Sequence, residues 1–255
     1  MGKNLRFVLL GMQATITLIL TSFFVHGLYL ATALDIQQAA IPHFVPSLIH
    51  LWVTLIAALL LCVFYRANIG AEARFLPMLF LMISLGNVKV LPLYQSISHV
   101  MVLSPYLVGI AYHFSFLFST FLFLASGLFQ QNTNPVKLGQ YSFVGAASAL
   151  FLSKITPIST NSASFLQEAS LTDNLFLGVC ILINLLAILT FIITIFEENR
   201  SRQTVARCFA FILMIAGNTM VTITQESLFN ILGLVLYISG TALLILVTRT
   251  YHIWS

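Results

Sequence analysis

Residues 174–196 of the chain read NLFLGVCILINLLAILTFIITIF. This stretch of 23 residues contains no charged residue and lies between Asp173 and Glu197. A helix needs about 20 mostly apolar residues to cross a hydrocarbon layer of about 30 Å. The stretch also lacks the alternation of polar and apolar residues that is typical of a membrane β-strand. It therefore predicts a membrane-spanning helix.

The composition of the whole chain agrees with this prediction. Of 255 residues, 59% are hydrophobic and 7% are charged, whereas a soluble domain has roughly 25% charged residues. The 11 basic and 7 acidic residues are too few to cover the surface of a water-soluble protein. We expect an all-α, polytopic transmembrane helix bundle, a single integral membrane domain over residues 1–255, with the lipid bilayer as its main solvent.

Eight apolar stretches of sufficient length occur along the chain, each bounded by charges, prolines or polar clusters. They cover approximately residues 7–30, 46–65, 75–94, 105–129, 141–158, 174–196, 208–224 and 228–248. The first stretch follows Lys3 and Arg6, and Ala31-Thr32-Ala33 has the form of a signal-peptidase site. Because an uncharged run over residues 7–34 is too long for a signal peptide, we expect an uncleaved first helix; cleavage would leave seven spans.

The basic residues are distributed unequally between the two sides of the predicted bundle. If Met1 is cytoplasmic, only Lys89 and Lys154 lie on the outer side. The other nine fall on the inner side: Lys3, Arg6, Arg66, Arg74, Lys137, Arg200, Arg202, Arg207 and Arg249. Lys and Arg are retained on the cytoplasmic side during insertion, so both termini are predicted to be cytoplasmic. This topology explains the net charge of +4, and we expect no nucleic-acid partner.

Signatures of known chemistry are absent from the sequence. No Asp or Glu lies at the centre of a predicted span, and the chain has no G-x-S-x-G, H-E-x-x-H, G-x-x-x-x-G-K-[ST] or G-x-G-x-x-G motif. The cysteines Cys62, Cys180 and Cys208 form no C-x-x-C pair and are interpreted as packing residues. We therefore predict no catalytic residue, no metal site and no cofactor, and a protein that is not an enzyme.

The histidines and one lysine form the candidate site. In the predicted topology most of the histidines lie in the outer half of the protein, together with Lys89 and Asn87 in the third span. A cation within lipid costs on the order of 3 kcal/mol on insertion scales, which favours a polar surrounding for Lys89. The predicted ligand-binding residues are His26, His50, Asn87, Lys89 and His113. Lys89 would meet an anionic or carbonyl group, and the histidines would supply hydrogen bonds.

A second interpretation of the same residues needs no ligand. Histidine is common near the membrane interface, and Lys89 is about one and a half turns from the outer end of its span, within reach of the interface.

Small residues elsewhere indicate packing: Gly217 with Asn218, and Gly233 with Gly240, are expected where the last two spans cross.

Two segments with basic turns resemble a known family. They are residues 65–80, with the pattern Y-R-x-N-x-x-x-E-x-R-F-L-x-x-L-F, and residues 200–218, RSRQTVARCFAFILMIAGN. Both are similar to the seven-helix membrane sensor regions that precede histidine kinases and cyclases in bacteria, and to their stand-alone relatives. The resemblance implies a membrane sensor region, but it carries over no functional residue. The chain departs from the pattern in lacking a kinase or cyclase domain.

The sequence thus suggests a multi-pass protein of the inner membrane of a bacterium. The expected role is a sensor-like or accessory subunit that binds a small or lipidic ligand from the extracytoplasmic side and works with a protein partner or as a homo-oligomer. A small transporter or permease subunit is one alternative, and an intramembrane enzyme that handles a lipid or haem is another.

Overall fold

The structure is a computed structural model, and it describes residues 3–64, 72–129, 135–157, 174–196, 201–223 and 227–253. Every regular element within these residues is helical, which confirms the predicted all-α class. Of the two segments that resemble the sensor regions, residues 65–71 and residue 200 lie outside the described part. The elements, in chain order, are α1 (Lys3–Ala33), α2 (Gln37–Phe64), α3 (Glu72–Gly86), the 3-10 helix η1 (Asn87–Val90), α4 (Leu91–Ser98), α5 (Pro105–Leu128), α6 (Pro135–Ile155), α8 (Asn174–Phe196), α9 (Arg202–Ile223) and α10 (Ser227–Ile253).

Seven of the described helical segments are long and apolar enough to cross a membrane. The consecutive elements α3, η1 and α4 count as one of them, over Phe75–Ser98. The protein is therefore a multi-pass, integral membrane protein by the length and composition of its helices.

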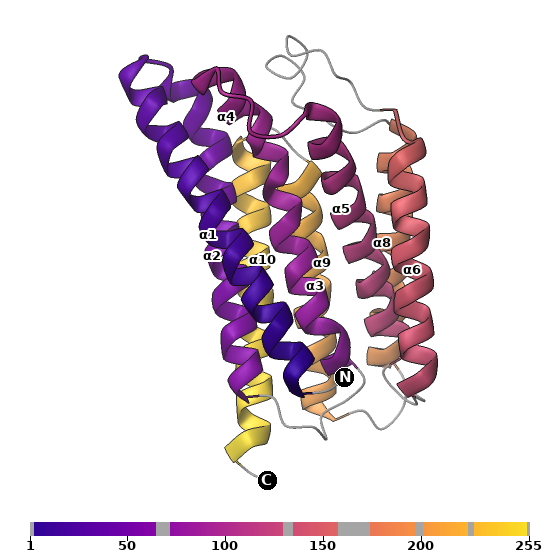
Figure 1. The fold of residues 1–255 in the computed structure, drawn as a ribbon. Coiled ribbons are helices and arrows are strands. Elements are labelled where there is room, and N and C mark those ends of the chain that lie inside the picture. The colour runs from indigo at the N-terminus through magenta and orange to yellow at the C-terminus, as the bar shows by residue number, and fades with distance from the viewer. Residues whose placement is uncertain are drawn as a thin grey trace.

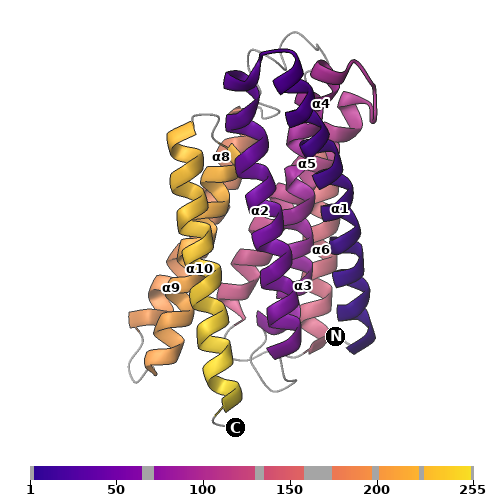
Figure 2. The same ribbon diagram turned by 90° about the vertical axis from the view of Figure 1, so that its left-hand side faces the viewer.

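Helix α6 corresponds to the remaining predicted span. Its 21 residues extend over about 31 Å, and it packs beside α5 (Figure 1). The start of α1 and the end of α10 lie at the same end of the bundle in both views (Figures 1 and 2). A chain whose two ends lie on the same side crosses the membrane an even number of times. With α6 as the eighth span, which remains a prediction, the number of crossings is even.

On helix α2, polar side chains lie on the face that is buried in the bundle, and the exposed face is apolar. On α2, the side chains of Ser47, His50 and Thr54 are buried, whereas Ile49 and Ile56 are exposed on the other face. Lipid offers no hydrogen bonds, so polar side chains are more stable when they face other helices. The outward faces are consistent with contact with lipid.

Helices α9 and α10 form a closely packed hairpin (Figure 2). A Cβ atom added to Gly217 would lie 2.4 Å from the backbone nitrogen of Tyr237, and one added to Gly240 would lie 2.8 Å from the carbonyl oxygen of Ala210. The backbones of the two helices are thus in direct contact. The predicted crossings at Gly217, Gly233 and Gly240 are confirmed.

The third span is interrupted within the membrane-length segment. Helix α3 ends at Gly86, the chain makes the 3-10 turn η1, and α4 continues to Ser98 (Figure 1). Asn87 and Lys89, which were both selected as candidate site residues, lie on this turn. A 3-10 segment inside a longer helix often occurs at a functional position.

Candidate functional site

Lys89 binds the C-terminal end of α9. Its Nζ atom donates hydrogen bonds to the backbone carbonyl oxygens of Val221 and Thr222, the latter at 3.0 Å. The last four carbonyl groups of a helix have no partner within the helix, and this end carries partial negative charge. A lysine from η1 therefore supplies both donors and positive charge where α9 needs them. The sequence did not indicate this partner for Lys89.

Tyr112 of α5 binds the same helix end. Its hydroxyl group donates to the carbonyl oxygen of Thr222 at 3.1 Å. The Thr222 carbonyl consequently accepts one hydrogen bond from η1 and one from α5. These contacts connect α9 to two elements that precede it by more than 100 residues in the chain.

His50 of α2 and Asn87 of η1 form a buried pair beside this helix end. Each side chain is 2% exposed, and Nδ1 of His50 lies 3.3 Å from the side-chain amide of Asn87. Asn87 also donates from Nδ2 to the carbonyl oxygen of Ile83 at 3.1 Å. The Asn87 amide presents both its oxygen and its Nδ2 atom to Nδ1 of His50 at 3.3 Å, so Nδ1 either donates to the oxygen or accepts from Nδ2. In the neutral tautomer that carries its proton on Nδ1, Nε2 of His50 is an acceptor.

The Nε2 atom of His50 has no hydrogen-bond partner among the described residues, although it is buried. The His50 ring instead packs edge-on against the Tyr237 ring of α10, with their centroids 4.5 Å apart. A buried polar atom without a partner costs about 1–3 kcal/mol, so it has to be explained by its surroundings. It marks a position where a ligand hydroxyl group, which can donate or accept, would find a hydrogen-bond partner.

Thr54 and Tyr237 extend the buried polar residues toward α10. The Thr54 hydroxyl donates to the carbonyl oxygen of His50 at 2.6 Å, and it lies 3.0 Å from the Tyr237 hydroxyl. Because the single hydroxyl proton of Thr54 is used by His50, Tyr237 is the donor in the second contact. We refer to His50, Thr54, Asn87, Lys89, Tyr112 and Tyr237 as the polar cluster.

The other two predicted site residues have partners elsewhere. His26 lies on the exposed side of α1, where its Nδ1 atom is 3.0 Å from the Tyr94 hydroxyl of α4. His113 is fully buried, and its ring packs against Phe176 of α8 with a centroid distance of 4.4 Å. The structure therefore places His50, Asn87 and Lys89 together and His26 apart from them, whereas the His113 ring also lies beside Tyr112 of the polar cluster, with centroids 5.7 Å apart.

Sequence reasoning missed Thr54, Tyr112 and Tyr237. One signal was available on α2, where Ser47, His50 and Thr54 recur at helical spacing in an otherwise apolar helix, and this spacing places them on one face. The other two residues had no comparable signal. A tyrosine in an apolar span is also typical of the membrane interface.

Metal ligation receives no support from the described residues, since no three His, Cys, Asp or Glu side chains among them lie close enough together to hold a metal ion.

No protein-family model matches the chain, and neither a curated protein nor a solved structure matches it. Inferences about function therefore depend on the residues of this chain alone.

Proposed function

We propose that this integral membrane protein is a sensor-like or accessory subunit, and that its polar cluster binds a small anionic ligand from the extracytoplasmic side. The observation that carries the proposal is the hydrogen bonding of Lys89. Among the residues that the structure describes, its ammonium group contacts backbone carbonyl oxygens and no carboxylate. A carboxylate or phosphate is a stronger partner for an ammonium group than a neutral carbonyl, so such a ligand can compete for Lys89.

The neighbouring His50 narrows the class of ligand. In the tautomer that carries its proton on Nδ1, the buried Nε2 atom of His50 is an acceptor, and it has no partner among the described residues. A ligand that combines an anionic oxygen with a hydroxyl or N–H group would satisfy both Lys89 and His50. Small hydroxycarboxylates and amino acids have this combination of groups.

The hairpin of α9 and α10 offers a route for a response. These helices pack chiefly on each other, and Lys89 and Tyr112 hold the end of α9 that lies next to the polar cluster. Competition of a ligand for Lys89 would loosen this end, and the closely packed hairpin would move as a unit. In the predicted topology the opposite end of the hairpin is cytoplasmic, where a partner protein could detect the change. This is the behaviour that the resemblance to sensor regions implies.

The proposal is tested with the purified full chain in detergent. Lactate supplies a carboxylate and a hydroxyl group, acetate supplies the carboxylate alone, and phosphate supplies a different anion. We expect lactate to raise the unfolding temperature more than acetate does, and Lys89→Gln and His50→Leu to abolish the increase. Lys154→Gln is the matched control, because Lys154 is the other outer lysine in the predicted topology and is exposed on α6.

If Lys89 only stabilises the fold and binds no ligand, the unfolding experiment gives a different result. In that case Lys89→Gln lowers the unfolding temperature, but no anion shifts the unfolding temperature of the wild-type protein. An increase with lactate that persists in both variants would also contradict the proposal. His113→Leu is included because His113 was predicted as a ligand residue, and its contact with Phe176 predicts that the increase with lactate is retained.

One structural observation favours a transporter subunit as a second candidate. The 3-10 turn η1 interrupts a span and carries the half-buried Lys89, and broken helices form the substrate sites of many transporters. Flux of lactate into proteoliposomes that contain the protein would support this function. Binding without flux would support the sensor-like role.

A further inference from the structure

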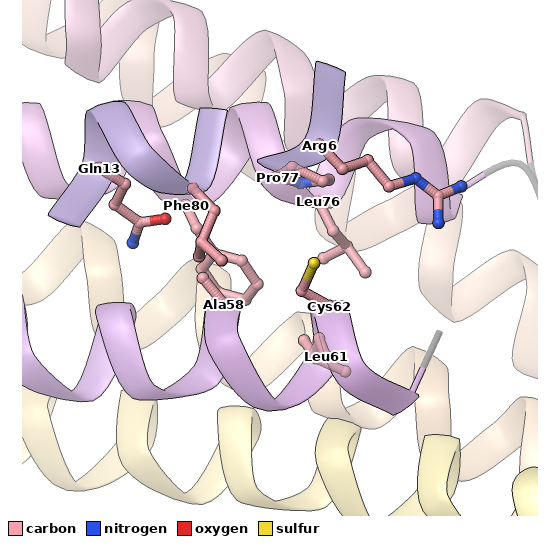
Figure 3. A pocket seen from close by; sticks show the side chains of 9 residues that line it. Arg6, Gln13, Ala58, Leu61, Cys62, Leu76, Pro77 and Phe80 are labelled. Carbon is pink, nitrogen blue, oxygen red and sulfur yellow. The ribbon is translucent and has the colours of Figure 1, made fainter. Parts of the chain in front are cut away.

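A partly open cavity lies between α1, α2 and α3, at the end of the bundle where α1 begins. It holds about 390 Å³ of space free of protein atoms, and part of this space is open to the surroundings of the protein. Figure 3 shows its lining, with Arg6 at one end of the row and Gln13 at the other. The residues between them are apolar and come from all three helices: Leu10, Ala58, Leu61, Cys62, Leu76, Pro77 and Phe80.

The cavity has a closed end and a basic end. Gln13 donates from Nε2 to the Ser84 hydroxyl of α3 at 3.0 Å, so this donor is already used and joins α1 to α3 above the apolar walls. Arg6 lies seven residues earlier on α1, which corresponds to about 10 Å along the helix axis. The cavity therefore combines a hydrocarbon-lined wall of this length with one cationic side chain.

Helix α1 is also the span that is least covered by the rest of the protein. Only 22% of its membrane-length window is buried, the lowest share of the seven spans. A cavity against such a helix is next to the surrounding lipid. The walls offer few groups to a polar solute, but they match a hydrocarbon chain.

We propose that this cavity binds one acyl chain of an anionic phospholipid, with the headgroup beside Arg6. A hydrocarbon tail gains little from moving between bilayer and protein, because both surroundings are apolar. Selectivity must therefore come from the headgroup, and Arg6 is the cation among the cavity residues. In the predicted topology this end faces the cytoplasmic leaflet, which carries anionic lipid. The site is separate from the polar cluster and does not depend on the proposed function.

Cys62 provides a direct measurement of occupancy. Its sulfur atom points from α2 toward Leu76 in the cavity (Figure 3). Cys62 is partly exposed, whereas Cys180 and Cys208 are fully buried, so a maleimide will modify Cys62 first. The rate at which N-ethylmaleimide modifies Cys62 is measured on the full chain in detergent, with added phosphatidylglycerol, phosphatidylcholine of the same acyl chains, or oleate.

Phosphatidylglycerol is expected to protect Cys62 at a concentration about fivefold lower than the concentration of phosphatidylcholine that gives the same protection. One basic side chain increases the affinity for an anionic lipid by about this factor. Arg6→Gln is expected to remove this preference. Arg202→Gln is the matched control, since Arg202 is an exposed arginine in the first turn of α9, and it should keep the preference. Ala58→Leu fills the cavity and should slow modification without lipid.

Several outcomes would overturn the proposal. They are equal protection of the wild-type protein by the two phospholipids, an unchanged preference in Arg6→Gln, or protection by oleate but not by phosphatidylglycerol. If a variant fails to fold, a second measurement on the wild-type protein decides. Phosphatidylglycerol with a photoreactive diazirine in its acyl chain should label peptides that contain Leu10, Leu61 or Phe80, and labelling confined to other helices would contradict the assignment.

Discussion

The ammonium group of Lys89 donates a hydrogen bond to the backbone carbonyl oxygen of Thr222 at 3.0 Å. This contact joins the 3-10 turn in the middle of the third span to the C-terminal end of α9. It satisfies a carbonyl group that has no partner in its own helix, and it places the positive charge at the negative end of the α9 dipole. The stability of the bundle and the proposed ligand response both depend on this contact.

Replacement of Lys89 by methionine is expected to lower the stability of the bundle. The variant keeps the length of the side chain but leaves the Val221 carbonyl without this donor, and hydrogen bonds to charged groups contribute about 1.5–3 kcal/mol. Thermal unfolding in detergent, followed by circular dichroism, measures the change. Tyr112→Phe removes only one neutral hydrogen bond and should cost about 0.5–1.5 kcal/mol. A Lys89→Met protein as stable as the wild type would show that the helix end does not need the lysine.

Removal of the Asn87 amide should destabilise the protein through His50. In Asn87→Leu the Nδ1 atom of His50 loses its hydrogen-bond partner and stays buried, at a cost of about 1–3 kcal/mol. The double variant Asn87→Leu with His50→Leu removes both polar groups. We expect it to be more stable than Asn87→Leu alone, because no unpaired group is left behind. Additive losses in chemical denaturation would show that the two side chains do not interact.

An alanine at Gly217 should separate α9 from α10. Its Cβ atom would meet backbone atoms of Tyr237 and Gly233 at 2.4 and 2.6 Å, and backbone cannot move aside as a flexible side chain can. We expect a loss of about 1–3 kcal/mol, as in other overpacked cores. Gly178→Ala on α8 is the matched control, since no atom lies within 4 Å of the added Cβ. That change should be neutral or stabilising by up to about 1 kcal/mol. Equal effects of the two substitutions would contradict direct contact between the backbones of α9 and α10.

The predicted orientation can be tested by adding one cysteine at a time to a Cys62→Ala background, in which the remaining Cys180 and Cys208 are fully buried. Met101 and Ser201 are both exposed, and they belong to connections predicted on opposite sides of the membrane. A membrane-impermeant maleimide added to right-side-out vesicles should modify Met101→Cys but not Ser201→Cys. Both should react after the vesicles are opened with detergent. Modification of Ser201→Cys alone in sealed vesicles would reverse the topology.

The helical architecture followed from local sequence properties. An uncharged run such as residues 174–196 must satisfy its backbone hydrogen bonds internally when it lies in lipid, so length and composition predict a helix with little help from the rest of the chain. Close packing at Gly217 and Gly240 was also predictable, because small residues allow helices to approach each other in a membrane. The break after Gly86 was not predicted, although Pro92 was a signal for it, because proline has no backbone N–H to donate to Val88 four residues earlier.

The candidate site was predictable only in part. Lys89, His50 and Asn87 were selected because such residues are costly in lipid, and the structure places them beside one another. The sequence also suggested His26 and His113 as neighbours. His26 contacts Tyr94 instead, and His113 packs against Phe176 and beside Tyr112 of the polar cluster. Residue type shows that a polar side chain needs a partner, and it does not show which helix supplies that partner.

The sequence by itself determined that this chain is a helical, multi-pass membrane protein, because crossing a hydrocarbon layer requires apolar runs of a known length. Only the tertiary structure decided that Lys89 binds the end of α9 and that an apolar cavity extends from Arg6 to Gln13. The physical reason is that these features join residues far apart in the chain. Such contacts depend on how the helices pack against one another, and the sequence of a single helix does not contain that information.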